Sequence, residues 1–127
     1  LRYFLDSYEF PYTSREDQLS SADVGLTLCE ALIARTGSVM VSSSQLSGRR
    51  MPGFMPVHIV LAYTSQIIRD IKDGFKLMKE KYEDEIPSMI SFITGPSSTA
   101  DIEGTLVQGA HGPKEIYVFL IDDNSIN

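Results

Sequence analysis

The loop Gly95–Thr99 combines residue types that could bind an anion. Gly95 permits backbone conformations closed to residues with a Cβ, and Pro96 fixes the backbone after it. The three hydroxyl residues that follow lie beside the free backbone N–H groups expected at the start of a helix over Thr99–Gln108. Such groups attract negative charge. The loop is therefore a candidate site for a small ligand.

The same loop also fits a purely structural role. Ser98 and Asp101 have a capping-box-like spacing, which can satisfy the helix start without any ligand. Asp101 also places a negative charge at the positive end of the helix, which disfavours a tightly bound phosphate. A neutral hydroxyl-rich ligand or a thioester carbonyl would be less affected. Both interpretations remain open at this level.

Three residues are candidates for acid–base chemistry: His111, Asp101 and Glu103. His111 lies in a glycine-rich turn, where it could act as a general acid or base or simply stabilise the turn. Asp101 and Glu103 are two residues apart, so on one helix they would point about 200° away from each other. They can share a pocket only if the helix begins after Asp101. No spacing of His or Cys residues fits a metal site, and we predict no metal.

Two further segments could contribute to the same pocket. The turn Thr36–Ser38 offers hydroxyls, and Arg49 lies in the Ser, Gly and Pro-rich loop Ser42–Pro56, where it could pair with a carboxylate or phosphate or remain solvated. The candidate ligand-binding residues are Thr36, Gly37, Ser38, Arg49, Gly95, Pro96, Ser97, Ser98, Thr99, Asp101, His111 and Gly112.

The elements that must position these residues follow the pattern of an α/β protein. Predicted strands cover Val24–Thr27, Ser38–Ser42, Val57–Tyr63, Met89–Thr94 and Ile116–Asp122. Predicted helices cover Leu28–Ala34, Thr64–Glu85 and Thr99–Gln108. The last strand–helix–strand unit resembles a βαβ crossover, so we expect a single domain with a mainly parallel sheet flanked by helices. His58 is predicted to be a structural hydrogen-bonding group, and Cys29 a buried, inert thiol.

Composition excludes several classes of function. The net charge of −6 argues against nucleic-acid binding, which needs a basic face. No apolar run reaches the roughly 18 residues of a membrane span, and the single cysteine fits a cytoplasmic protein. One cysteine cannot ligate an iron–sulfur cluster, so we expect no cofactor. The chain begins with Leu1 and not methionine, which suggests that the full protein has further N-terminal residues.

Three ordered blocks of the sequence resemble the LUD-domain family, the lactate-utilisation protein C group. GPSSTADIEG…GAHGP is similar to that family's GPSRTADIE…GVHGP signature, ARTGSVMV to its ETGT segment, and GRRMPGFMPVHIVLA to its GR…LP…H strand. The resemblance spans roughly residues 24–122. It implies residues 22–127 as a LUD-like domain of NagB/RpiA/CoA-transferase-like fold, preceded by an aromatic-rich arm over residues 1–21. That arm could pack on the domain or on a second copy in a homodimer.

The resemblance implies an accessory role in L-lactate oxidation to pyruvate, alongside iron–sulfur partner proteins, with a small anionic metabolite as ligand. The alternative is a small enzyme that acts on a thioester or sugar phosphate, by analogy of fold. Two residues depart from the family pattern: Ser98 replaces the usual arginine and Arg35 the usual glutamate. Each change alters the charge expected around the pocket.

Overall fold

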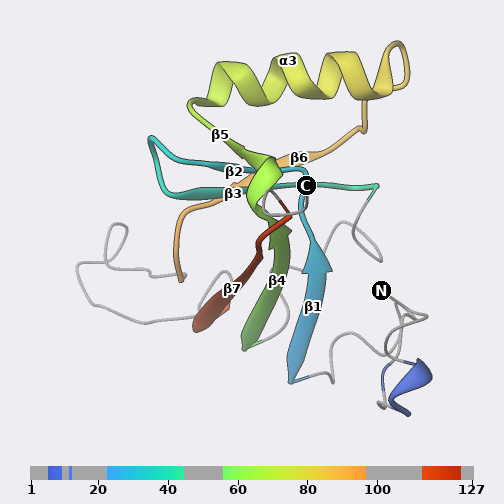
Figure 1. Ribbon diagram of the computed structural model, residues 1–127, viewed down its shortest axis with the longest axis vertical. Helices are drawn as coiled ribbons and strands as arrows, with labels where there is room; N and C mark the ends of the chain where they lie inside the picture. The colour runs from blue at the N-terminus through green and yellow to red at the C-terminus, as the bar shows by residue number, and fades with distance from the viewer. Residues whose placement is uncertain (1–5, 10–11, 13–22, 45–55, 97–112, 124–127) are drawn as a thin grey trace.

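Strands from both halves of the chain form two sheets, and one long helix packs on the second of them (Figure 1). The computed structural model describes residues 6–9, 12, 23–44, 56–96 and 113–123. Its regular elements are β1 (Val24–Leu28), β2 (Ala31–Ile33), β3 (Ser38–Ser42), β4 (Val57–Tyr63), the 3₁₀ helix η2 (Thr64–Gln66), β5 (Ile67–Ile68), α3 (Ile71–Tyr82), β6 (Ile90–Ile93) and β7 (Glu115–Ile121).

Parallel pairing predominates in the two sheets. The three-stranded sheet has the order β1-β4-β7, and both of its strand pairs are parallel. The four-stranded sheet has the order β5-β2-β3-β6, in which β5 runs parallel to β2 while the other two pairs are antiparallel. The predicted α/β class with a mainly parallel arrangement is therefore confirmed.

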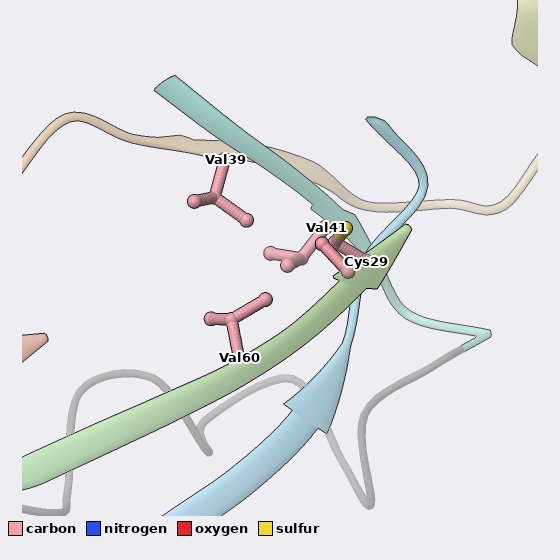
Figure 2. Packing of buried hydrophobic residues seen from close by; sticks show 5 residues of the cluster. Cys29, Val39, Val41 and Val60 are labelled. Carbon is pink, nitrogen blue, oxygen red and sulfur yellow. The ribbon is translucent and has the colours of Figure 1, made fainter. Parts of the chain in front are cut away.

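Strand β3 lies between two hydrophobic cores and all five of its residues are buried. Val39 and Val41 point toward the three-stranded sheet, where they pack with Cys29, Val60 and Ala62 (Figure 2). Met40 points the other way, into a second cluster formed with Ala31, Ile33 and Met78 of α3. Because side chains alternate along a strand, β3 contributes to both cores at once. The layers are therefore helix α3, the four-stranded sheet and the three-stranded sheet.

Helix α3 is shorter than the predicted helix Thr64–Glu85. Asp70 caps its start, and its carboxylate accepts a hydrogen bond from the Ile71 N–H at 2.7 Å. The Asp73 carboxylate in turn accepts a hydrogen bond from the Asp70 N–H at 3.1 Å. The residues before Asp70 form η2 and the short strand β5 instead. Met78 of this helix is buried, whereas Phe75 is half exposed and meets Phe92 edge to face. No helix in the described part of the chain is long and apolar enough to cross a membrane.

The predicted helix Leu28–Ala34 is wrong, because these residues include strand β2. Ala31 and Ile33 alternate into the core beneath α3, and Gly37, with φ +66°, makes the tight turn into β3. Thr27 and Glu30 do not cap a helix, since both side chains are buried in other contacts. Tertiary partners have overridden a local helix signal here.

The predicted βαβ unit around Gly95 is also wrong in its pairing. Strand β6 lies antiparallel to β3 in the four-stranded sheet, whereas β7 lies parallel to β4 in the other sheet. The two strands were correctly located, but they are not neighbours. The helix predicted over Thr99–Gln108 lies outside the described residues.

Truncation of Met78 should reveal how strongly α3 is held to the sheet. Met78→Ala removes a fully buried side chain from the cluster beneath the helix, so we expect the free energy of unfolding to fall by about 2–5 kcal/mol. Urea denaturation measures this change. Lys79→Ala, at the next, exposed position, is the control and should alter stability by no more than about 0.5 kcal/mol. Equal effects of the two substitutions would contradict the packing described.

Candidate functional site

Two turns that are distant in sequence meet through a row of hydroxyl groups. The Ser38 Oγ lies 2.7 Å from the Thr36 Oγ1 and 2.6 Å from the Thr94 Oγ1. The contact follows from strand register, since Val39 of β3 pairs with Ile93 of β6. The structure thus brings the predicted residues Thr36, Gly37 and Ser38 beside the residue that precedes Gly95. Ligand binding at these turns stays a prediction.

Each of the two turns contains a glycine with a positive φ, a backbone conformation that residues with a Cβ rarely adopt. Gly37 has φ +66° and Gly95 has φ +99°, and a Cβ at either position would meet no atom within 4 Å. The requirement is therefore for the backbone angle and not for space. Pro96 follows Gly95, as expected for a stiffened exit from β6.

Most of the predicted site lies outside the described residues. This holds for the ligand candidates Arg49, Ser97, Ser98, Thr99, Asp101, His111 and Gly112 and for the catalytic candidate Glu103. Their roles stay predictions.

An open cavity of about 560 Å³, more exposed than enclosed, lies beside the first of the two turns and is lined by Ala34, Arg35 and Arg69. Two main-chain bonds shape its wall: the Ala34 N–H donates to the Ile68 carbonyl at 2.9 Å, and the Arg35 N–H donates to the Arg69 carbonyl at 3.0 Å. Both guanidinium side chains belong to exposed residues. The two arginines bring positive charge to the cavity, partly offset by the Asp70 carboxylate, which pairs with Arg35.

Arg35 also holds the residue that caps α3. Its Nη1 donates to the Asp70 Oδ2 at 2.6 Å, and this contact, with the hydrogen bond from the Ile71 N–H, holds the pKa of the Asp70 carboxyl below its usual range. The Arg35 side chain is 71% exposed, so the ion pair adds little to stability. It also engages the Arg35 guanidinium, which is therefore only partly available to a ligand of the cavity. The sequence marked Arg35 only as a departure from the family pattern, and Arg69 not at all.

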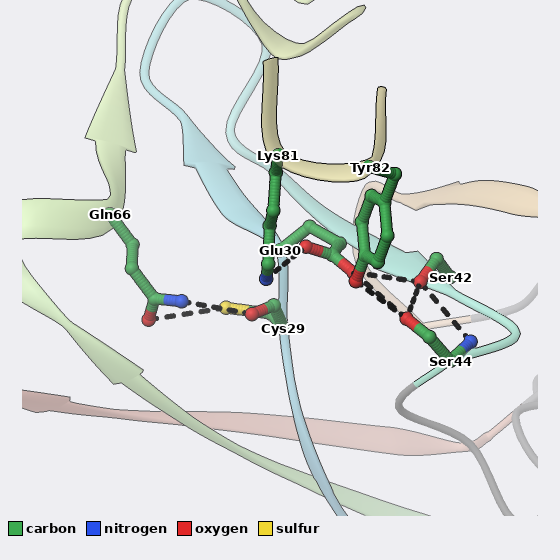
Figure 3. Close-up of polar contacts among 7 residues, drawn as sticks. All are labelled: Cys29, Glu30, Ser42, Ser44, Gln66, Lys81 and Tyr82. Carbon is green, nitrogen blue, oxygen red and sulfur yellow. Dashed lines mark hydrogen bonds and ion pairs between the residues drawn. The ribbon is translucent and has the colours of Figure 1, made fainter. Parts of the chain in front are cut away.

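A buried carboxylate forms the densest polar network in the described part of the chain (Figure 3). The Glu30 side chain has no exposed surface and pairs with the Lys81 Nζ at 2.8 Å. The Tyr82 hydroxyl donates to Glu30 Oε1 at 2.5 Å, and Ser42 and Ser44 donate to the same oxygen at 2.8 and 3.2 Å. The network joins the end of β3 to the last turn of α3.

Opposing effects set the pKa of the Glu30 carboxyl. Burial alone would raise it, but the hydrogen bonds from Lys81, Tyr82 and Ser42 favour the charged form and together lower it. The hydrogen bond between Lys81 and Glu30 raises the pKa of Lys81, because the carboxylate stabilises the ammonium. Sequence reasoning missed this network. Its only local signal was a glutamate within an otherwise apolar run, Leu28–Ala34.

Cys29 lies next to Glu30 and is buried, as predicted, although it follows strand β1 and is not on a helix. Burial and the adjacent Glu30 carboxylate raise the pKa of its thiol to about 11. Gln66 clamps this position: its Nε2 donates to the Cys29 carbonyl at 2.9 Å, and the thiol donates to its Oε1 at 3.8 Å (Figure 3). A thiol with so high a pKa is a poor nucleophile at neutral pH.

His58 has the structural hydrogen bond that the sequence predicted. Its Nε2 lies 2.7 Å from the Thr27 Oγ1, across the pairing of β1 with β4, and both residues are buried. Burial lowers the pKa of the imidazole, which favours the neutral ring. The Nδ1 atom has no partner among the described residues. Within that part of the chain, no group of three or more His, Cys, Asp or Glu side chains is arranged to hold a metal ion.

Comparison with known proteins assigns the chain to a family. The family model of the LUD domain matches residues 4–121, and the chain therefore belongs to the LUD-domain family. A DUF162-family protein from Deinococcus radiodurans, solved at 1.70 Å, superposes with a TM-score of 0.58 over 87% of this chain and 58% of that one. The two are 19% identical, so this likeness shows a common fold.

Several relatives are identical to this chain at about a third of the aligned positions. The chain is 32% identical over 121 residues to lactate utilization protein C of Anoxybacillus flavithermus, and 35% identical over 104 residues to that of Bacillus licheniformis. These alignments include 92% and 80% of the chain but 54% and 43% of the relatives. The chain thus spans about half the length of the relatives it matches.

Removal of the buried charge should destabilise the protein in a pH-dependent way. Glu30→Gln breaks the Lys81 pair inside a network of donors, so we expect a loss of about 1–3 kcal/mol at pH 7, measured by urea denaturation. Because the folded pKa of Glu30 is lowered, its contribution is present above the unfolded pKa of about 4.3 and is lost as the pH falls through the folded value.

The difference between wild type and Glu30→Gln should consequently shrink at pH 3. Glu80→Gln, which removes an exposed carboxylate from the same helix, is the matched control and should have little effect at either pH. A deficit that is the same at pH 3 and pH 7 would show that the Glu30 charge does not contribute.

Proposed function

We propose that this chain is an accessory protein of lactate utilisation, which supports L-lactate oxidation to pyruvate together with iron–sulfur partner proteins. The observation that carries the proposal is the identity of 32–35% with proteins named lactate utilization protein C, over most of this chain. The matched residues include β1 to β7, so the shared part contains every strand described above.

The chemistry of the reaction favours a division of labour. Oxidation of lactate to pyruvate removes two electrons and two protons from the hydroxyl-bearing carbon and its oxygen, and a redox group must accept the electrons. Iron–sulfur clusters are held by several cysteine thiolates, whereas this chain has one cysteine in 127 residues. That cysteine is buried, and its pKa of about 11 keeps it protonated. Partner proteins would therefore supply the redox centres.

A small anionic metabolite is the proposed ligand of the cavity between Arg35 and Arg69. The Arg69 guanidinium could pair with a carboxylate, with Arg35, which already bonds Asp70, beside it. The row of hydroxyls begins at Thr36, directly after Arg35. Arg49 and the loop that follows Gly95 would contribute further contacts under this proposal.

The second candidate is a small enzyme of CoA-transferase or sugar-phosphate-isomerase type, with a thioester or sugar phosphate as substrate. The α/β fold and the same arginine-lined cavity favour it. Fold analogy is a weak basis for an activity. The two candidates differ in the ligand they require and in their dependence on partner proteins.

Ligand-induced stabilisation tests the cavity directly. We expect lactate or pyruvate to raise the melting temperature of the wild type, and a ligand present at 100 times its dissociation constant should add about 2.7 kcal/mol. Arg69→Ala should abolish the shift, because it removes one guanidinium from the cavity. Lys76→Ala, which removes an exposed cation from α3, is the matched control and should retain it.

The panel also includes coenzyme A, its esters and sugar phosphates. A shift from these compounds alone, lost in Arg69→Ala, would support the enzyme. A shift that persists in Arg69→Ala would place the ligand elsewhere. Gel filtration with iron–sulfur lactate-utilisation proteins completes the test: we expect a stable complex without added ligand, and its absence would contradict the accessory role.

A further inference from the structure

Strand β7 is the most exposed apolar segment in the described part of the chain. It ends the order β1-β4-β7, and among the described strands it pairs only with β4. Five consecutive large residues remain between 43% and 54% exposed: Tyr117, Val118, Phe119, Leu120 and Ile121. The strand has one charged residue, Glu115, at its first position.

Such an edge is unusual for a protein surface. Edge strands are normally short or carry charged side chains, proline or a bulge, because their unpaired N–H and C=O groups are a template for another strand. β7 has seven residues and none of these features beyond its first position. A near-continuous apolar run of this kind is typical of a parallel-sheet strand whose two faces are covered.

Main-chain hydrogen bonds define which residues of β7 point away from β4. The Glu115 N–H donates to the Pro56 carbonyl at 3.1 Å, so Glu115 faces β4. Because this orientation alternates along a strand, the N–H and C=O groups of Ile116, Val118 and Leu120 are directed at the outer edge. An antiparallel partner strand can hydrogen-bond to all three residues only under one condition. The residue opposite each of them must also direct its N–H and C=O groups across the interface.

We propose that the outer edge of β7 pairs antiparallel with β7 of a second copy of this chain, about a two-fold axis at Val118. This register places Val118 opposite its own counterpart and Ile116 opposite Leu120, so that all the outward residues pair. It is also the register that overlaps the whole of Glu115–Ile121. The two three-stranded sheets then form one continuous sheet, with the same surface used by both copies, as a two-fold interface requires.

Side-chain complementarity supports the same register. Lys114 of one copy lies opposite Asp122 of the other, twice by symmetry, which brings opposite charges together at both ends of the interface. The Asp122 Oδ1 also accepts a hydrogen bond from the Thr64 Oγ1 of its own chain at 3.3 Å, so the Lys114 contact would add to that bond. Tyr117 lies opposite Phe119, which makes two aromatic cross-strand pairs on one face. A register shifted by two residues, with its axis at Tyr117 or Phe119, loses the Lys114–Asp122 pairing. This interface does not depend on the proposed role in lactate utilisation.

Sedimentation equilibrium of the purified chain tests the dimer. We expect wild type to associate from 14.1 kDa to twice that mass, and Val118→Lys to remain monomeric because two like charges then lie opposite each other. Val24→Lys is the matched control: it adds the same charge to the far strand β1 at a site that is 48% exposed, and should leave the dimer intact. Circular dichroism checks that each variant is folded.

A charge exchange tests the register even if Val118→Lys does not fold. Lys114→Asp and Asp122→Lys should each weaken association by about tenfold, since two symmetric pairs change from attraction to repulsion, and the double variant should restore it. A wild type that stays at 14.1 kDa at every concentration would overturn the proposal. So would a dimer that Val118→Lys and Val24→Lys affect equally, or a double variant that shows no recovery.

Discussion

Double-sided burial of β3 is the constraint on which the rest of this structure depends. Its valines pack toward the three-stranded sheet and Met40 packs toward α3, so a single strand holds three layers in place. The pairing of β3 with β2 on one side and β6 on the other follows from this position. The same register carries Ser38 to Thr94 and thereby assembles the hydroxyl row. The hydroxyl row is thus a consequence of core packing.

Glu30 performs a related task with polar contacts. A charged side chain with no exposed surface is costly unless it is paired and fully hydrogen-bonded, and here Lys81, Tyr82 and two serines meet that demand. These partners come from the end of β3 and the last turn of α3, so the network specifies how the helix lies across the sheet. Cys29, one residue earlier, is consequently buried beside a negatively charged carboxylate.

The two surfaces proposed for function lie on different parts of the fold. The arginine-lined cavity belongs to the link between β2 and β3 and the residues after β5, whereas the apolar edge belongs to β7 of the other sheet. A dimer through β7 therefore involves neither arginine of the cavity. Substitutions at the cavity and at β7 should therefore alter the proposed ligand binding and the proposed self-association separately.

The sequence by itself determined the family, the α/β class, the position of most strands and the burial of Cys29 and His58, because these depend on local alternation, turn residues and ordered motifs. The ligand-binding role of every candidate residue stays a prediction. Only the tertiary structure decided that Ala31–Ile33 is a strand, that β6 and β7 belong to different sheets, and that Glu30 and Lys81 pair. Each of these depends on residues many positions apart, and a local pattern contains no information on which distant side chain will cover it.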